Sequence, residues 1–94
     1  MMDKNGLTKL QEECAELITI AAKKAAYFHT DAHPDGKGSM KKRLEEETGD
    51  VFAAACFVID KFGLDFWAIR SRQQAKYALF QQWDADPDNY SDEE

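Results

Sequence analysis

The run VFAAACFVI, residues 51–59, is the longest uninterrupted apolar stretch of the chain. In a helix, such a run covers every side, so no face of the segment tolerates water. It is also far too short to cross a bilayer, which takes about 20 residues, and we expect no membrane partner. Three helices from one chain of 94 residues cannot enclose this run. The run therefore predicts a helical bundle that further copies of the chain complete.

Apolar residues recur at spacings of three and four in three segments, as they do along one face of a helix. The first segment covers about residues 7–29, and the second extends from an N-cap at Ser39 to a stop at Gly63. Asp65 can cap a third helix. No alternation typical of strands is found. The predicted fold class is all-α, with three main helices per chain in a bundle completed by homodimerisation or a higher oligomer, such as a homotetramer.

The net charge of −6 comes entirely from the C-terminal end of the chain. Residues 1–83 hold twelve Lys and Arg and twelve Asp and Glu, so we expect a neutral domain there and an acidic, mobile tail over residues 84–94. Without a basic stripe, duplex nucleic acid is not an expected partner. Cys14 and Cys56 are too few for a disulfide framework, and we expect both to act as small buried apolar residues in a cytoplasmic protein.

Two acidic clusters, EECAE and EEETGD, lie on the first and second predicted helices. At 100° per residue, Glu13 and Glu16 of the first, and Glu47 and Asp50 of the second, lean toward the apolar stripe. A solvated acidic face is the alternative for either cluster alone. Unpaired buried carboxylates are costly, so four that converge must share protons, meet cations or bind metal. Carboxylates three residues apart can hold one hard cation, which predicts a cage for Mg²⁺ or Mn²⁺.

Two cations of the third helix, Arg72 and Lys76, project between apolar residues one turn apart. They could offset the charge of a polyphosphate bound to the metal. The alternative is a structural salt bridge with Glu13 or Asp50. We expect both histidines of the loop that follows the first helix, His29 and His33, to be exposed rather than zinc ligands, because the proline after His33 prevents a shared helical face.

The phrases LQEECAEL and LEEETGDV resemble the motifs of the MazG-like all-α nucleoside triphosphate pyrophosphohydrolases, relatives of the dimeric dUTPases and of phosphoribosyl-ATP pyrophosphohydrolase. The resemblance covers about residues 7–83. It implies Mg²⁺-dependent cleavage of a nucleotide between the α- and β-phosphates, giving a monophosphate and pyrophosphate. One departure is the spacing: thirty residues separate Glu16 from Glu47, more than is usual, and we place the excess in the loop of residues 30–38.

The resemblance also implies roles for individual residues. Those at the metal-ligand positions are Glu13, Glu16, Glu47 and Asp50. Glu12 and Glu46 stand at flanking acidic positions, where they would activate the attacking water or support the ligands. Lys76 lies where the family carries basic phosphate-binding residues. Two alternatives stay open: a relative with a narrower substrate, such as dUTP, dCTP or phosphoribosyl-ATP, and a non-catalytic helical dimer that binds nucleotide or metal.

Overall fold

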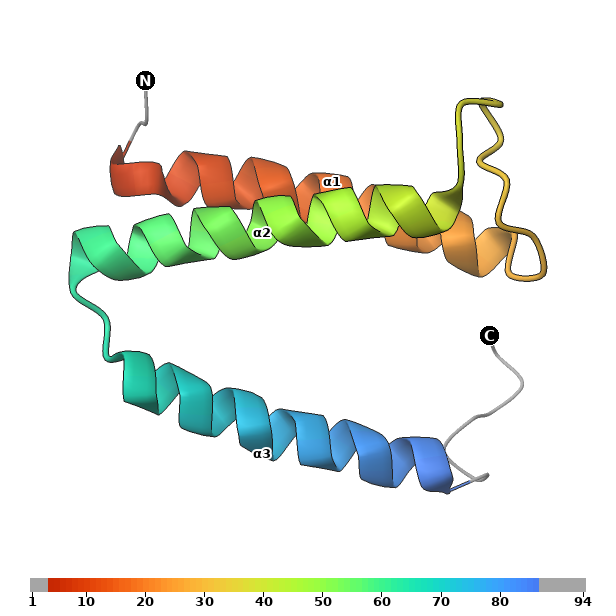
Figure 1. Cartoon of the computed structure of the whole chain (residues 1–94). Coiled ribbons are helices and arrows are strands. Elements are labelled where there is room, and N and C mark those ends of the chain that lie inside the picture. The colour runs from red at the N-terminus through yellow and green to blue at the C-terminus, as the bar shows by residue number, and fades with distance from the viewer. Residues whose placement is uncertain (1–3, 87–94) are drawn as a thin grey trace. The chain divides into compact units, whose positions relative to one another are not determined.

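The computed structural model describes residues 4–86, which form helices joined by loops and contain no strand. A short 3₁₀ turn, η1 (Lys4–Gly6), leads into α1 (Leu7–Ala26), and α2 (Met40–Phe62) and α3 (Phe66–Ala85) follow (Figure 1). The all-α class predicted from the sequence is confirmed. By its internal contacts the chain divides into two compact units, residues 1–64 and 65–94, and each is described by itself.

The ends of α2 and the start of α3 are set by the capping residues that the sequence predicted. Ser39 is the N-cap of α2, and its hydroxyl accepts a hydrogen bond from the Lys42 amide at 3.0 Å. Gly63 ends the helix in the left-handed conformation, with a φ of 61° that costs glycine little. Asp65 caps α3 by accepting from the amide groups of the second and third residues after it.

The first helix ends at Ala26, three residues before the predicted position. Tyr27 leaves the helical region with φ −114° and ψ 49°, and the amide of Thr30 donates back to its carbonyl at 3.1 Å. The Lys24 ammonium donates to the carbonyl groups of Phe28 and Thr30, each at 3.0 Å. A lysine side chain that satisfies carbonyl groups beyond the last turn stabilises this helix end.

In the first unit, α1 and α2 form an antiparallel hairpin, side by side along their length (Figure 1). Few side chains are fully buried between them: Ile20 of α1 and Met40, Ala54 and Val58 of α2. Gly6, just before α1, allows the Phe57 ring of α2 to approach the backbone closely, because a Cβ at this position would lie 2.6 Å from Cδ2 of Phe57. This core is small, so much of the apolar surface of the hairpin lies open within one chain.

The loop between α1 and α2 is closed by its own backbone hydrogen bonds. The His33 amide donates to Gly38, and the Gly36 amide donates to His33. The Asp31 carbonyl accepts from Met40, and its carboxylate accepts from Lys41 at 2.9 Å, which anchors the loop to the first turn of α2. His33 is only 5% exposed. The expectation of an exposed His33 was therefore wrong, because the loop folds back on itself, whereas His29 is exposed as expected.

The apolar run of residues 51–59 is only partly covered within one chain. Ala54 and Val58 are buried, but Phe52 is 68% exposed and Cys56 is exposed. The expectation of a buried Cys56 is thus wrong for the single chain, because the thiol lies on the face of α2 turned away from α1; Cys14 is half-buried. No helix in the described part of the chain is long and apolar enough to cross a membrane.

Taken by itself, α3 is amphipathic only weakly and buries none of its residues. Its aromatic residues pair along the helix, Phe66 with Trp67 and Phe80 with Trp83, with ring centroids 5.4 and 5.7 Å apart. The helix continues to Ala85 and so includes the first two residues of the predicted acidic tail. The rest of that predicted tail, from residue 87 on, lies outside the described residues.

Candidate metal-binding site

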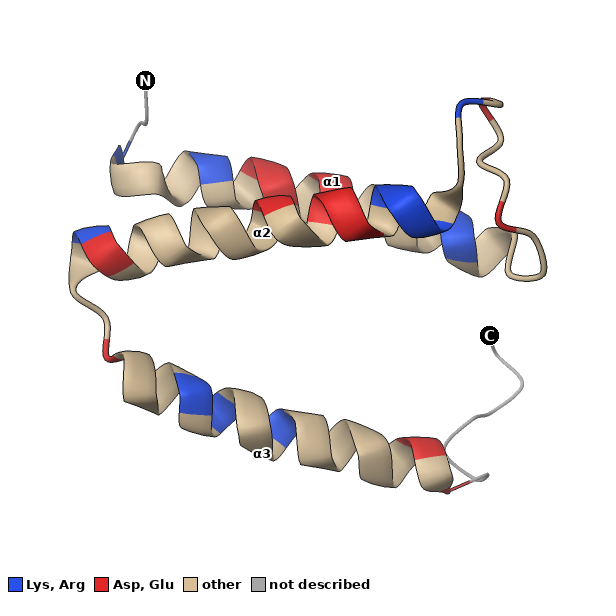
Figure 2. Ribbon diagram, viewed as in Figure 1, with Lys and Arg blue, Asp and Glu red and all other residues tan. Residues whose placement is uncertain are grey.

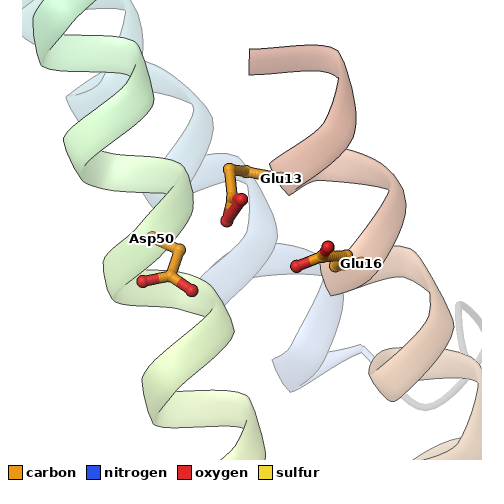
Figure 3. Close-up of side chains that lie close together, drawn as sticks. All are labelled: Glu13, Glu16 and Asp50. Carbon is orange, nitrogen blue, oxygen red and sulfur yellow. The ribbon is translucent and has the colours of Figure 1, made fainter. Parts of the chain in front are cut away.

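The antiparallel hairpin brings the two acidic clusters to the same level along the helix pair (Figure 2). Glu13 and Glu16 of α1 and Asp50 of α2 point toward one another (Figure 3). One oxygen from each of these three carboxylates lies within 4.8 Å of the others. Glu13 is half-buried, and the other two are exposed. Three of the four residues predicted as metal ligands are thus brought together, although the role itself stays a prediction.

The fourth predicted ligand, Glu47, lies one turn before Asp50 on α2 and is half-buried. Burial raises the pKa of its carboxyl, and repulsion by Glu16, Asp50 and Glu13, with a hydrogen bond to the Glu16 side chain, adds to this. The interactions with all three partners show that Glu47 belongs to the same cluster. We call these four residues, Glu13, Glu16, Glu47 and Asp50, the acidic cluster.

The pKa of Glu13 is raised for the same reasons as that of Glu47. Partial burial raises the pKa of its carboxyl, and the Glu16 and Asp50 carboxylates raise it further, while Lys9 opposes them. Lys9 is mainly engaged elsewhere, since its ammonium lies 2.7 Å from a carboxylate oxygen of Glu12. Within the described residues no cation forms an ion pair with the acidic cluster, and a cation among its oxygens would relieve the repulsion.

The donor set suits a hard divalent cation. Mg²⁺ takes oxygen ligands at about 2.0–2.1 Å in an octahedron, so neighbouring ligand oxygens are about 3 Å apart and opposite ones about 4.2 Å. The three carboxylate oxygens lie within 4.8 Å of one another, a separation close to that between opposite ligands of such an ion. The exposed carboxylates also leave one side of the cluster open to solvent, where water or phosphate oxygens could complete the coordination.

The predicted catalytic residues, Glu12 and Glu46, lie next to the acidic cluster in the chain, and both are exposed. Glu12 is paired with Lys9, as described above. The predicted phosphate-binding residues, Arg72 and Lys76, are exposed on α3, which belongs to the second unit. The roles proposed for these four residues therefore stay predictions.

A hollow of about 250 Å³ adjoins the acidic cluster at the end nearer the α1–α2 loop. Glu16 of α1 and Glu47 of α2 line it. Lys23 of α1, His33 of the loop and Arg43 of α2 also line it. The hollow is thus a mixed-charge recess built entirely from the first unit of the chain.

Sequence reasoning missed these three basic residues. A signal was available for two of them, because Lys23 lies seven residues after Glu16 and Arg43 four before Glu47. Both spacings place the cation on the same helix face as the acid. His33 gave no such signal, since its position depends on how the loop folds.

A second hollow, of about 430 Å³, adjoins the acidic cluster toward the other end of the hairpin. Glu13, Asp50 and Lys9 supply its charged groups, and Ala53, Ala54 and Phe57 supply an apolar wall. The acidic cluster therefore lies between a mixed-charge recess and a partly apolar one, an arrangement that can accommodate a ligand with a charged end and an apolar end.

Comparison with protein-family models, with curated proteins and with solved structures finds no match to this chain. The resemblance to the MazG-like enzymes therefore rests on the two acidic motifs alone.

Proposed function

We propose that this protein is a Mg²⁺-dependent nucleotide pyrophosphohydrolase, which cleaves a nucleoside or deoxynucleoside triphosphate to the monophosphate and pyrophosphate. The observation that carries the proposal is the convergence of Glu13, Glu16 and Asp50 from two helices to within 4.8 Å, with Glu47 coupled to all three. Four neighbouring carboxylates that form no ion pair with a described residue repel one another. Binding of a divalent cation by these carboxylates would offset their mutual repulsion and so explain why they lie together.

In this proposal the acidic cluster holds Mg²⁺, or Mn²⁺, by its carboxylate oxygens. Such an ion, when bound, would supply electrostatic stabilisation of phosphate charge. Glu12 and Glu46 flank the cluster and would orient the attacking water and accept its proton. Arg72 and Lys76 would offset the negative charge of the leaving pyrophosphate.

We further propose that the protein works as a homodimer, or a homotetramer, through the open face of α2. Phe52 and Cys56 lie one turn apart on that face, and Phe52 is 68% exposed. Covering apolar surface of this kind with a second copy contributes about 25 cal/mol for each Å² removed from water. A reducing, cytoplasmic environment suits the two free cysteines, one of them exposed.

The experiment that tests the proposed function is product analysis with Mg²⁺ and the eight common NTPs and dNTPs. We expect monophosphate and pyrophosphate in equal amounts, and the ranking of substrates would distinguish a broad enzyme from one specific for dUTP or dCTP. Asp50→Asn should abolish turnover, whereas Glu45→Gln, which removes an exposed acid outside the acidic cluster on the same helix, should not. Release of diphosphate and phosphate, or nucleotide binding without turnover, would contradict the proposal.

A further inference from the structure

The basic side of the hollow near the loop contains cations with unused hydrogen-bonding capacity. The Lys23 ammonium makes no hydrogen bond or ion pair with any described residue. Arg43 uses one guanidinium nitrogen, Nη2, on the Asp35 carboxylate at 2.9 Å and has further N–H donors. Both side chains can therefore donate to a ligand without losing a contact inside the protein.

His33 is held in this hollow by the loop. Its Nδ1 lies 3.1 Å from the Asp35 amide nitrogen and 2.9 Å from a carboxylate oxygen of the same residue, so Asp35 occupies that side of the ring. The other ring nitrogen, Nε2, makes no hydrogen bond with any residue of the described part of the chain. Among the described residues, every fully buried side-chain nitrogen or oxygen has a hydrogen-bond partner. Because Nε2 has none, it is not fully buried and must contact solvent, although His33 as a whole is only 5% exposed. It is the atom left for a ligand.

The charge balance of the hollow determines when an anion can bind there. Glu16 and Glu47 line the same space and would repel an anion from the end nearer the acidic cluster. A divalent cation on the acidic cluster would cancel that repulsion, so anion binding should require the metal. The hollow at the other end has an apolar wall of Ala53, Ala54 and Phe57, which favours an uncharged group instead.

We propose that Lys23, His33 and Arg43 form an anion subsite for the terminal phosphate groups of a nucleotide, and that the loop between α1 and α2 contributes to it through Nε2 of His33. This inference rests on the proposed function, since the metal makes the subsite attractive to anions. It also gives the loop a role in ligand binding. The nucleoside end of the same ligand then lies toward Phe57.

The test is calorimetric binding of inorganic pyrophosphate to the full chain, with and without Mg²⁺. Binding should need Mg²⁺, and Lys23→Gln should weaken it about tenfold or more, as expected for loss of a hydrogen bond between charged groups. Lys42→Gln, a neighbouring exposed lysine of α2 that does not line the hollow, is the control and should bind as the wild type does.

Two substitutions of His33 separate ligand binding from loop structure. The side-chain oxygen of asparagine can replace Nδ1 as the acceptor for the Asp35 amide, because Asn readily accepts from the amide two residues further on. Asparagine has, however, no atom at the position of Nε2. Glutamine has its amide nitrogen near the place of Nε2 instead. We expect His33→Asn to lose pyrophosphate affinity and His33→Gln to retain most of it; the reverse order would show that His33 only supports the loop and would overturn its assignment.

The outcomes distinguish this inference from the proposed function. Pyrophosphate binding that is absent, independent of Mg²⁺, or equal in Lys23→Gln and Lys42→Gln overturns the subsite, even if nucleotides are hydrolysed to monophosphate. The expected pattern of pyrophosphate binding without any turnover supports the subsite and overturns only the enzymatic function.

Discussion

Replacing Asp50 by Asn is expected to stabilise the metal-free protein and to remove its response to Mg²⁺. The Asp50 and Glu16 carboxylate oxygens lie within 4.8 Å of each other. Two unit charges at that distance repel by about 0.9 kcal/mol in water, and physiological salt screens this to about half. We therefore expect removal of the Asp50 charge to stabilise the fold by about 0.5 kcal/mol, with the repulsion between Asp50 and Glu13 acting in the same direction.

The assay is thermal unfolding at pH 7 and equal protein concentration, in EDTA and in Mg²⁺. In EDTA, Asp50→Asn should melt about 2–4 °C above the wild type, since about 1 kcal/mol corresponds to roughly 4–8 °C in a domain of this size. Mg²⁺ at a hundred times its dissociation constant should stabilise the wild type by about 2.7 kcal/mol. The order of the two melting temperatures should therefore invert when Mg²⁺ is added.

The control is Glu45→Gln, which makes the same change of charge on an exposed position of α2 outside the acidic cluster. It should melt close to the wild type in both conditions. If Asp50→Asn melts at or below the wild type in EDTA, the carboxylates do not repel one another as described. If Mg²⁺ raises both melting temperatures equally, Asp50 is not a ligand.

Three further predictions concern stability and assembly. Burial and neighbouring carboxylates raise the pKa of Glu47 in the folded protein above its usual 4.5. The protonated Glu47 therefore stabilises the fold fully below about pH 4.5, and this stabilisation is lost as the pH rises through the raised pKa of the folded state. Urea unfolding of the metal-free protein should show this loss, and Glu47→Gln should reduce it. Gly6→Ala should lower the melting temperature more than Gly36→Ala: both have positive φ, but only the first places a Cβ 2.6 Å from a ring atom of Phe57. Phe52→Glu should convert a dimer to a monomer in light scattering, and a wild type that is already a 10.7 kDa monomer would contradict the proposed assembly.

Local sequence rules predicted the helices well. Ser39, Gly63 and Asp65 each act on backbone groups within a few residues of themselves, so their effect does not depend on the rest of the fold. The end of α1 was the exception, because the carbonyl groups after Ala26 are bound by the side chain of Lys24, and no capping residue marks the position. A side chain that reaches forward over a turn leaves no clear pattern in the sequence.

Surface exposure was less predictable, because a periodic pattern indicates which face is apolar but not what covers it. The run of residues 51–59 was expected to be buried throughout, yet Phe52 and Cys56 are open in the single chain. The antiparallel contact with α1 covers only one side of α2, on which Ala54 and Val58 lie. Whether a second chain covers the other side depends on association rather than on the pattern.

The sequence by itself determined which residues of α1 and α2 could supply carboxylates, since the helical repeat places Glu13 with Glu16, and Glu47 with Asp50, on common faces. Only the tertiary structure decided that the two pairs meet, because the antiparallel packing sets their relative level along the hairpin. It also decided that His33 is buried beside them. The hydrogen bonds that close the loop join residues three to nine positions apart, and neither helical period nor residue propensity contains that information.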